Sequence, residues 1–349
     1  MKEAKKYLKN MILFVVLIAV TFYIVLKNQN IEDIKNALLS VDIKYLLVGV
    51  AAMFVYFGCE AFNLKRTLGV LGEKSSFIHC FRYVLIGFFF SAITPAASGG
   101  QPMQIYFMHK DKLSGAKSTL SLLILLCSYH IVTITFAIIS FCFNVATLTV
   151  PMRIMFVFGI ICSCTLFALY LIGIFSKKTS RALIGFGVKI LKLFKVKHIE
   201  EKEKKLIDGL DKYHGGAEYI KSNPRMMIKT ILITMLQMAA YYSISYWVYR
   251  SFGLTQNSIL SILTIQSILY ISVCVLPLPG SVGVSEGVFL GLYAKIYSEG
   301  LVGTAMMLHR GISFYLFVII CSIAVMYSTM KHKKEIEQEM VDEKVIIEK

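Results

Sequence analysis

Four ionisable side chains lie inside stretches of sequence that are otherwise apolar: Glu60, Arg82, Glu286 and Arg310. An ionisable group within a membrane is costly unless it is paired or hydrated, so such groups mark functional sites. Arg310 lies nine residues into an apolar stretch that begins at Leu301, and Glu286 follows a Pro- and Gly-rich break. We expect Glu286 and Arg310 to pair near the membrane midplane, in substrate handling or as a purely structural pair. Glu60 and Arg82 could pair with each other, act in gating or reach to the membrane interface.

Two apolar regions, 77–108 and 258–297, are interrupted by Pro and Gly. Each break precedes a short predicted helix, whose first N–H groups are free and carry a partial positive charge. Glycine at such a place lets an anion approach the backbone closely, and in a membrane the natural anion is a phospholipid phosphate. Simple kinks or ordinary short loops are the alternative interpretation of both breaks. The candidate binding residues are Pro95, Ser98, Gly99, Gly100, Gln101 and Pro102 in the first break, and Pro277, Pro279, Gly280, Ser281 and Gly283 in the second.

His130 lies in another apolar stretch, beside Tyr129. It could relay protons or contribute to gating, although a hydrogen-bonded packing role is the more common use of such a residue. The sequence shows no CxxC pair, nucleotide-binding loop or metal-binding signature. We therefore expect no metal and no cofactor.

Composition places these residues in a membrane protein. Of 349 residues, 56% are hydrophobic and 17% are charged, whereas an ordinary soluble domain is ~45–50% apolar and ~25% charged. This excess of apolar side chains excludes a soluble globular enzyme. Six stretches are long enough to cross a hydrocarbon core of ~30 Å. They are 11–26, 43–63, 118–142, 153–175, 226–249 and 301–330.

The distribution of Lys and Arg predicts the orientation in the membrane. The formal net charge is +16, and the connection 176–229 alone has fourteen basic and six acidic residues. Because basic residues concentrate in cytoplasmic loops, we expect the N-terminus, a basic loop at 176–225 and the tail 331–349 to be cytoplasmic. The excess charge is then a topological signal, and we expect no nucleic-acid partner.

Both interrupted regions are predicted to form hairpins. Segments 64–76 and 109–117 each carry more basic than acidic residues, so both are expected inside and 77–108 must cross an even number of times. Its second arm is too short to cross at 1.5 Å per residue, which predicts a re-entrant hairpin. Region 258–297 fits the same interpretation, although two full crossings stay open.

The predicted fold is an all-α polytopic membrane protein with about six full spans, two re-entrant or broken-helix hairpins, and both termini inside. Because each unit crosses an odd number of times, 11–142 and 151–330 would form an inverted repeat within a single integral membrane domain over 1–349. Inverted repeats with broken helices at matching positions are typical of transporters with a site near the midplane.

The two breaks resemble a known family. Residues 94–102, Thr-Pro-Ala-Ala-Ser-Gly-Gly-Gln-Pro, are similar to the first signature of the lysylphosphatidylglycerol synthase transmembrane-region family. Residues 276–286, with Arg310 and Tyr315 following, look like its second signature, although Ser281 stands where the family usually has a second glycine. The resemblance covers about residues 10–330. It implies a multi-pass protein of the bacterial inner membrane, like the membrane domain of the multiple peptide resistance factor. That domain flips aminoacylated phosphatidylglycerol, and a separate soluble domain transfers lysine from lysyl-tRNA to the lipid.

The leading hypothesis is a flippase-like translocator of a phospholipid or aminoacyl-phospholipid, with membrane phospholipids and their anionic headgroups as partners. Nineteen residues follow Met330, so we expect the chain alone not to catalyse aminoacyl transfer. A phosphatidylglycerol lysyltransferase, acting in lysyl-phosphatidylglycerol synthesis and antimicrobial-peptide resistance, is the alternative, and a small-solute or proton-coupled transporter is a third. Self-association as a homo-oligomer and a separate synthase partner both stay open.

Overall fold

The computed structural model describes residues 39–144, 148–176, 218 and 222–330, apart from 275, 277, 298 and 299. Every element in this part of the chain is a helix, which confirms the all-α prediction. Several expectations fall outside the described residues: the span 11–26, most of the basic loop 176–225, the tail 331–349 and Pro277.

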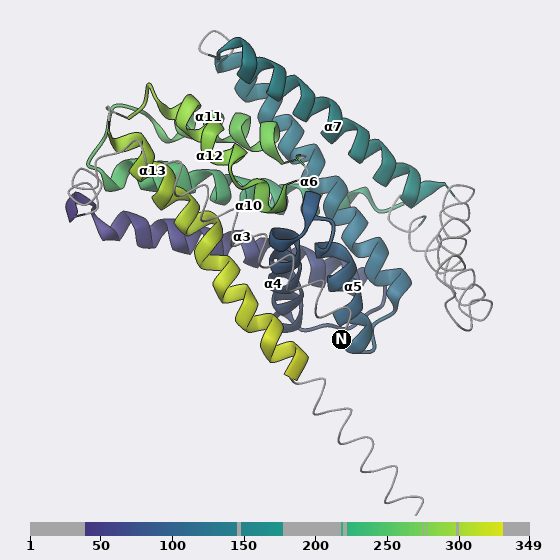
Figure 1. The fold of residues 1–349 in the computed structure, drawn as a ribbon. Coiled ribbons are helices and arrows are strands. Elements are labelled where there is room, and N and C mark those ends of the chain that lie inside the picture. Colours follow the sequence, from purple (N-terminus) through teal and green to yellow (C-terminus); the bar gives the residue numbers. More distant parts are fainter. Residues whose placement is uncertain are drawn as a thin grey trace, which may run out of the picture.

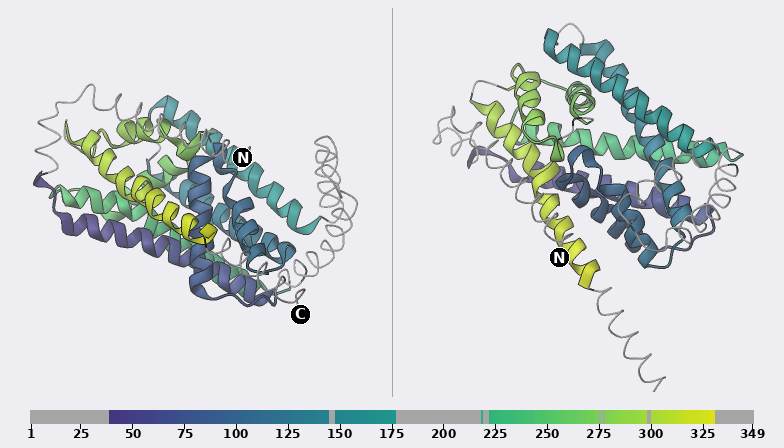
Figure 2. Two further views of the ribbon diagram at one scale, coloured as in Figure 1. Left: turned by 60° about the horizontal axis from the view of Figure 1, so that its bottom comes forward. Right: turned by 45° about the vertical axis from the view of Figure 1, so that its right-hand side comes forward.

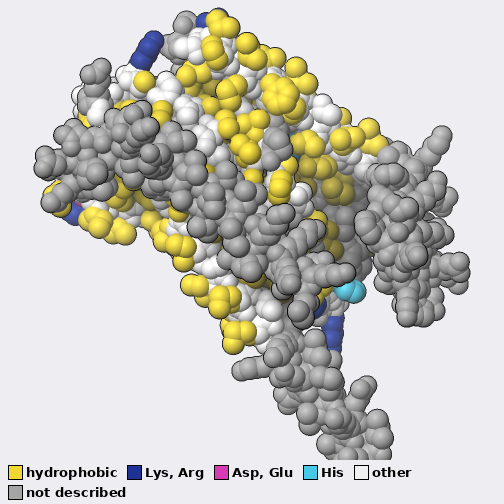
Figure 3. Space-filling view, viewed as in Figure 1, with side chains coloured by type: hydrophobic (Ala, Val, Ile, Leu, Met, Phe, Trp, Pro, Cys, Tyr) yellow, Lys and Arg dark blue, Asp and Glu magenta, His cyan; other side chains and the backbone are white. Residues whose placement is uncertain are grey.

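Five long helices are apolar enough to cross a membrane, and they correspond to five of the six predicted spans. Each has 26 to 30 residues, whereas ~20 suffice for a straight crossing, so all five can tilt. Hydrophobic side chains dominate the described surface on the face shown in Figure 3. The five are α3 (Ile43–Val70), α6 (Gly115–Asn144), α7 (Val150–Phe175), α10 (Pro224–Ser251) and the helix Leu301–Met330, which includes α13 (Leu301–Arg310) and a π-helical turn, η4 (Gly311–Tyr315).

Local sequence signals explain where several helices begin. The side chains of Asp42, Ser76 and Ser258 cap α3, α4 (Phe77–Ile93) and α11 (Ile259–Val273) by accepting hydrogen bonds from backbone N–H groups of the first turn. Proline occupies the first turn of α7 and α10, where its missing N–H leaves no helical bond unmade.

Helices α3 and α10 pack against each other as an antiparallel pair. The backbone N–H of Asp42, which precedes α3, donates to the carbonyl oxygen of Ser251 at the far end of α10, at 2.9 Å. Near the opposite end, the Asn63 amide donates to the Thr230 carbonyl oxygen and the Thr234 hydroxyl, both at 3.2 Å. The two helices run side by side in Figure 1, and α7 lies at one side of the molecule against α6 (Figures 1 and 2).

The two interrupted regions are helical hairpins. In the first, α4 (Phe77–Ile93) packs on α5 (Gly100–Lys110), and in the second, α11 (Ile259–Val273) contacts α12 (Val284–Tyr293). The turns between the arms are one-turn 3-10 helices, η1 (Pro95–Ala97) and η3 (Pro279–Ser281), and these two tips contact each other. With 15 and 10 residues, α11 and α12 reach only ~22 and ~15 Å. These lengths favour a hairpin over two full crossings in the second region.

Candidate functional site

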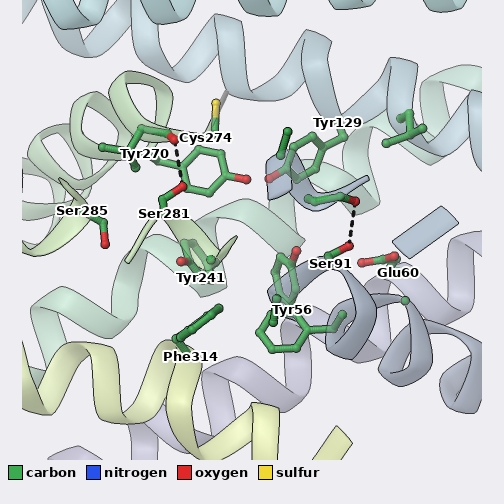
Figure 4. A pocket seen from close by; sticks show the side chains of 18 of the residues that line it. Tyr56, Glu60, Ser91, Tyr129, Tyr241, Tyr270, Cys274, Ser281, Ser285 and Phe314 are labelled. Atoms are coloured by element: carbon green, nitrogen blue, oxygen red, sulfur yellow. Dashed lines mark hydrogen bonds between the residues drawn. The ribbon is translucent and has the colours of Figure 1, made fainter. Parts of the chain in front are cut away.

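A cavity of about 440 Å³ lies where the two hairpin tips meet. This volume falls in the range of ~300–1,000 Å³ that is usual for small-molecule sites. Its walls come from α3, α4, α5, α6, α7, α10, α11, α12 and α13, and Figure 4 shows part of the lining. Seven of the predicted site residues line it: Glu60, Ser98, Gln101, His130, Gly280, Ser281 and Arg310.

The two tips share one backbone conformation. An extended residue (Thr94 or Leu278) is followed by proline and then by two consecutive residues with positive φ. In the first tip these are Ala96 (φ 51°) and Ala97 (φ 53°), and in the second they are Gly280 (φ 59°) and Ser281 (φ 51°). A non-glycine residue in this left-handed region costs about 1–2 kcal/mol, and such strain clusters at functional sites.

Gly99 and Gly100 serve packing, which corrects the expectation that they leave room for an anion. The Thr94 hydroxyl accepts a hydrogen bond from the Gly99 N–H at 2.9 Å, and a Cβ at Gly99 would collide with the same threonine. A Cβ at Gly100 would collide with Ser91 on α4. Neither glycine lines the cavity. Pro95 and Pro102 do not line it either, so from the first tip only Ser98 and Gln101 of the predicted residues do so.

In the second tip, a carboxylate from the first turn of α12 caps the N-terminus of that same helix. The Gly283 N–H, which we expected to be free for a phosphate, donates to Glu286 Oε2 at 2.7 Å. Gly283 has φ 91°, a conformation that requires glycine, and neither Gly283 nor Pro279 lines the cavity. At the tip itself, Ser281 Oγ donates to the Val273 carbonyl oxygen at 3.0 Å, and a Cβ at Gly280 would collide with the Phe314 ring.

Glu286 and Arg310 form the predicted ion pair. Arg310 Nε donates to Glu286 Oε1 at 2.7 Å, and both residues are buried, with 7% and 2% of their surface exposed for Arg310 and Glu286 respectively. The Tyr315 hydroxyl donates to the same Oε1 at 3.2 Å, and the Ser285 hydroxyl donates to Oε2 at 2.9 Å. Arg310 Nη2 also donates to the Gly280 carbonyl oxygen at 3.0 Å, which links the last helix directly to the second tip.

The guanidinium of Arg310 lies over an aromatic ring, with its central carbon 4.3 Å from the centroid of Phe314. Charge-assisted hydrogen bonds and this cation–π contact compensate the cost of burying the pair. Loss of one partner would leave the other as an unpaired buried charge.

Glu60 and Arg82 do not pair with each other, which rules out that one of the alternatives left open by the sequence. Because α4 and α5 run antiparallel, Arg82 meets Asp111 at the base of the first hairpin, where the Tyr83 hydroxyl donates to the same carboxylate. Glu60 instead accepts a hydrogen bond from Gln237 Nε2 at 3.2 Å. Within the described part of the chain, no basic group lies within 4.0 Å of the Glu60 carboxylate.

Sequence reasoning missed the polar and aromatic lining of the cavity. Besides the predicted Gln101, three further amides from three helices line it, and one of them, Gln266, accepts hydrogen bonds from Ser245 at 2.7 Å and from Tyr293 at 2.9 Å. Glutamines inside apolar stretches are a signal like that of ionisable groups, and the same rule could have found them. Tyrosines are too numerous in this sequence to single out. The missed residues are Gln104, Gln237, Gln266, Tyr56, Tyr129, Tyr241, Tyr270 and His309.

Two histidines line the cavity. His130 lies 5.5 Å from Tyr170 between ring centroids, and its Nδ1 has no hydrogen-bond partner among the described residues. His309 is stacked on Phe289, and neither of its ring nitrogens has a partner in this part of the chain. These ring nitrogens are themselves buried, although both side chains belong to the cavity lining. No cluster of His, Cys, Asp or Glu among the described residues suits a metal ion.

The sequence model of the lysylphosphatidylglycerol synthase TM region matches residues 11–321. The chain belongs to this family. A curated relative described as a UPF0104 membrane protein, from Archaeoglobus fulgidus, is 24% identical over 285 residues, which cover 78% of this chain and 83% of the relative. The predicted family resemblance is thereby confirmed. Family membership and the five apolar helices make the chain a membrane protein, and they suggest a lipid-related role.

Proposed function

We propose that the chain is a flippase-like translocator, in which a phospholipid headgroup passes through the cavity between the two hairpin tips of a cytoplasmic-membrane protein. The observation that carries the proposal is the buried pair Glu286–Arg310, which borders the cavity and holds the second tip through Gly280. The family to which the chain belongs supports a lipid substrate.

Arg310 is the proposed contact for the lipid phosphate. A guanidinium has five N–H donors, and Glu286 and Gly280 accept from only two of its nitrogens, Nε and Nη2. Because Arg310 also lines the cavity, a phosphate can approach it there while Glu286 neutralises the resting site. This assignment replaces the helix terminus at Gly283, whose N–H already bonds to Glu286.

An inverted repeat would explain how the site opens to either side. Helices α3 and α10 both have 28 residues, and α6 and the helix Leu301–Met330 both have 30. In the sequence, α3 and α6 flank the first hairpin, α10 and the helix Leu301–Met330 flank the second, and the two hairpin tips contact each other. In our proposal, rocking of one unit against the other exposes the cavity to one leaflet at a time while the acyl chains stay in lipid.

A translocation assay in proteoliposomes tests this function. Purified chain is reconstituted with fluorescent phospholipids, and a membrane-impermeant quencher reports how much label crosses the bilayer. We expect transport by the wild type and at least about a tenfold loss in Arg310→Ala. Arg250→Ala is the matched control, because Arg250 lies at the end of α10, bonds to Tyr45 and does not line the cavity. Wild-type rates equal to those of empty vesicles would refute the proposal. Lysyl-phosphatidylglycerol in extracts of cells that express only this chain would favour the lysyltransferase alternative.

A further inference from the structure

The carboxylic acid of the cavity lacks a described ion-pair partner. Apart from two histidines, the acidic and basic side chains among the described lining residues are Glu60 and Arg310, and Arg310 is already paired with Glu286, which does not line the cavity. Glu60 has no ion-pair partner among the described residues: its carboxylate accepts a hydrogen bond from the Gln237 amide and also interacts with the side chain of Gln104. An ionised carboxylate in a low-dielectric cavity attracts a cation strongly. Positive charge beside the ionised form of Glu60 would therefore be stabilised.

Aromatic rings line the same cavity as this carboxylate. Tyr56 lies one helical turn before Glu60 on α3, and Tyr56, Tyr270 and Glu60 all line the cavity. The rings continue as a chain across four helices: 5.4 Å separates the centroids of Tyr56 and Tyr241, 5.7 Å those of Tyr241 and Tyr270, and 6.1 Å those of Tyr270 and Tyr129. Figure 4 shows the four tyrosines and Glu60 around the same space.

This combination fits an organic ammonium. A carboxylate beside aromatic faces and hydroxyls offers one charge-assisted hydrogen bond together with cation–π attraction, which suits an alkylammonium group. A divalent metal ion would need six or more oxygen ligands, or a cluster of acidic and imidazole groups, and no such cluster occurs among the described residues.

We propose that Glu60 and the tyrosines Tyr56, Tyr129, Tyr241 and Tyr270 bind a primary ammonium group in the cavity. The inference rests on the proposed translocation of phospholipids and names the class of lipid: one whose headgroup carries both an ammonium and a phosphate. The ammonium binds at Glu60 and the phosphate at Arg310, so the cavity recognises the two ends of a zwitterionic headgroup separately.

Binding of short-chain lipids to the purified full chain in detergent tests the assignment without requiring transport. The probes are dihexanoyl phosphatidylethanolamine, its N-acetylated form, which lacks the positive charge, and dihexanoyl phosphatidylglycerol. We expect the wild type to bind the ethanolamine lipid at least about tenfold more tightly than the other two. In Glu60→Gln this preference should vanish. Glu73→Gln, which removes a carboxylate that pairs with Lys117 outside the cavity, should keep it.

A relocated carboxylate separates recognition from a folding defect. Gln237 donates to Glu60 across the α3–α10 interface. The double variant Glu60→Gln with Gln237→Glu therefore moves the carboxylate from α3 to the neighbouring position on α10. The preference for the ethanolamine lipid should return in the double variant. Free ethanolamine serves as a further probe. If it bound as tightly as the ethanolamine lipid, the ammonium site would stand, but a phospholipid as the source of the ammonium group would be overturned.

Two results would overturn the inference: a wild type that binds all three lipids equally, or a Glu60→Gln variant that keeps the preference. Both are distinguishable from failure of the proposed function. Translocation with no headgroup preference would leave the translocator in place without the ammonium site. Selective binding that depends on Glu60, in a chain that moves no lipid across vesicles, would leave the ammonium site without the translocator.

Discussion

The two hairpin tips have the same backbone shape but different chemistry. Both pass from an extended residue through proline into two left-handed residues, and both border the same cavity. The second tip is held by buried charge, since Arg310 binds the Gly280 carbonyl oxygen and Glu286 binds the Gly283 N–H. In the first tip, the neutral Thr94 hydroxyl accepts the hydrogen bond from the Gly99 N–H.

The backbone conformation of a hairpin tip therefore does not depend on charged side chains at that tip. Proline and the left-handed pair set the shape, because they recur in both hairpins, whereas the ion pair belongs to the second alone. The charged pair of the first hairpin, Arg82 and Asp111, lies at its base instead of its tip. We infer that the second tip is the one whose position responds to a charged ligand.

Removal of Arg310 should have the largest effect on stability. Arg310→Ala leaves Glu286 buried without its cation, which we expect to lower the free energy of unfolding by about 3–5 kcal/mol. Thermal unfolding of the purified protein in detergent measures this. Arg82→Ala at the base of the first hairpin should cost only about 1–2 kcal/mol, because Asp111 keeps the Tyr83 hydroxyl as a donor. An Arg82 variant that is the less stable of the two would contradict the proposed asymmetry.

Substitutions at the second residue of each turn should have opposite signs. Gly280→Ala places a methyl group against the Phe314 ring at positive φ, and we expect a loss of about 2–3 kcal/mol. Ala96→Gly at the matching place in the first tip relieves a strained alanine and should stabilise the fold by about 0.5–1 kcal/mol, after the added freedom of the unfolded chain is counted. Unfolding curves of the two variants give the comparison directly. If both variants shifted stability in the same direction, the shared tip geometry would be refuted.

Much of this architecture is predictable because it depends on length and local sequence. Apolar stretches of spanning length give the positions of the long helices, and Pro-rich breaks give the hairpins. The Glu286–Arg310 pair follows from the rarity of charge in such stretches. Glu60 and Arg82 follow the same rule, but their partners depend on which helix faces match, and the packing of α3 on α10 brings Gln237 to Glu60.

Glycines were harder to interpret for a related reason. A glycine looks the same in sequence whether a ligand or a neighbouring helix approaches it, and at Gly100 the neighbour is Ser91 of α4. The occupied terminus of α12 did leave a signal, because Glu286 stands three residues after Gly283, the spacing at which an acidic side chain caps its own helix.

A smaller predicted loss of stability concerns the neutral cap of the first tip. Thr94→Val keeps the shape of the side chain but removes the hydroxyl that accepts from Gly99 N–H and donates to the Phe90 carbonyl oxygen, so we expect a loss of about 1 kcal/mol. Thr94→Ser keeps the hydroxyl and should lie close to the wild type in the same unfolding measurement. The second tip has Leu278 at the matching place, where Leu278→Val should be nearly neutral because Glu286 supplies the cap there. A valine at position 94 that proved as harmless as one at 278 would show that the hydroxyl does not hold the first tip, and the contrast between a neutral and a charged cap would fail.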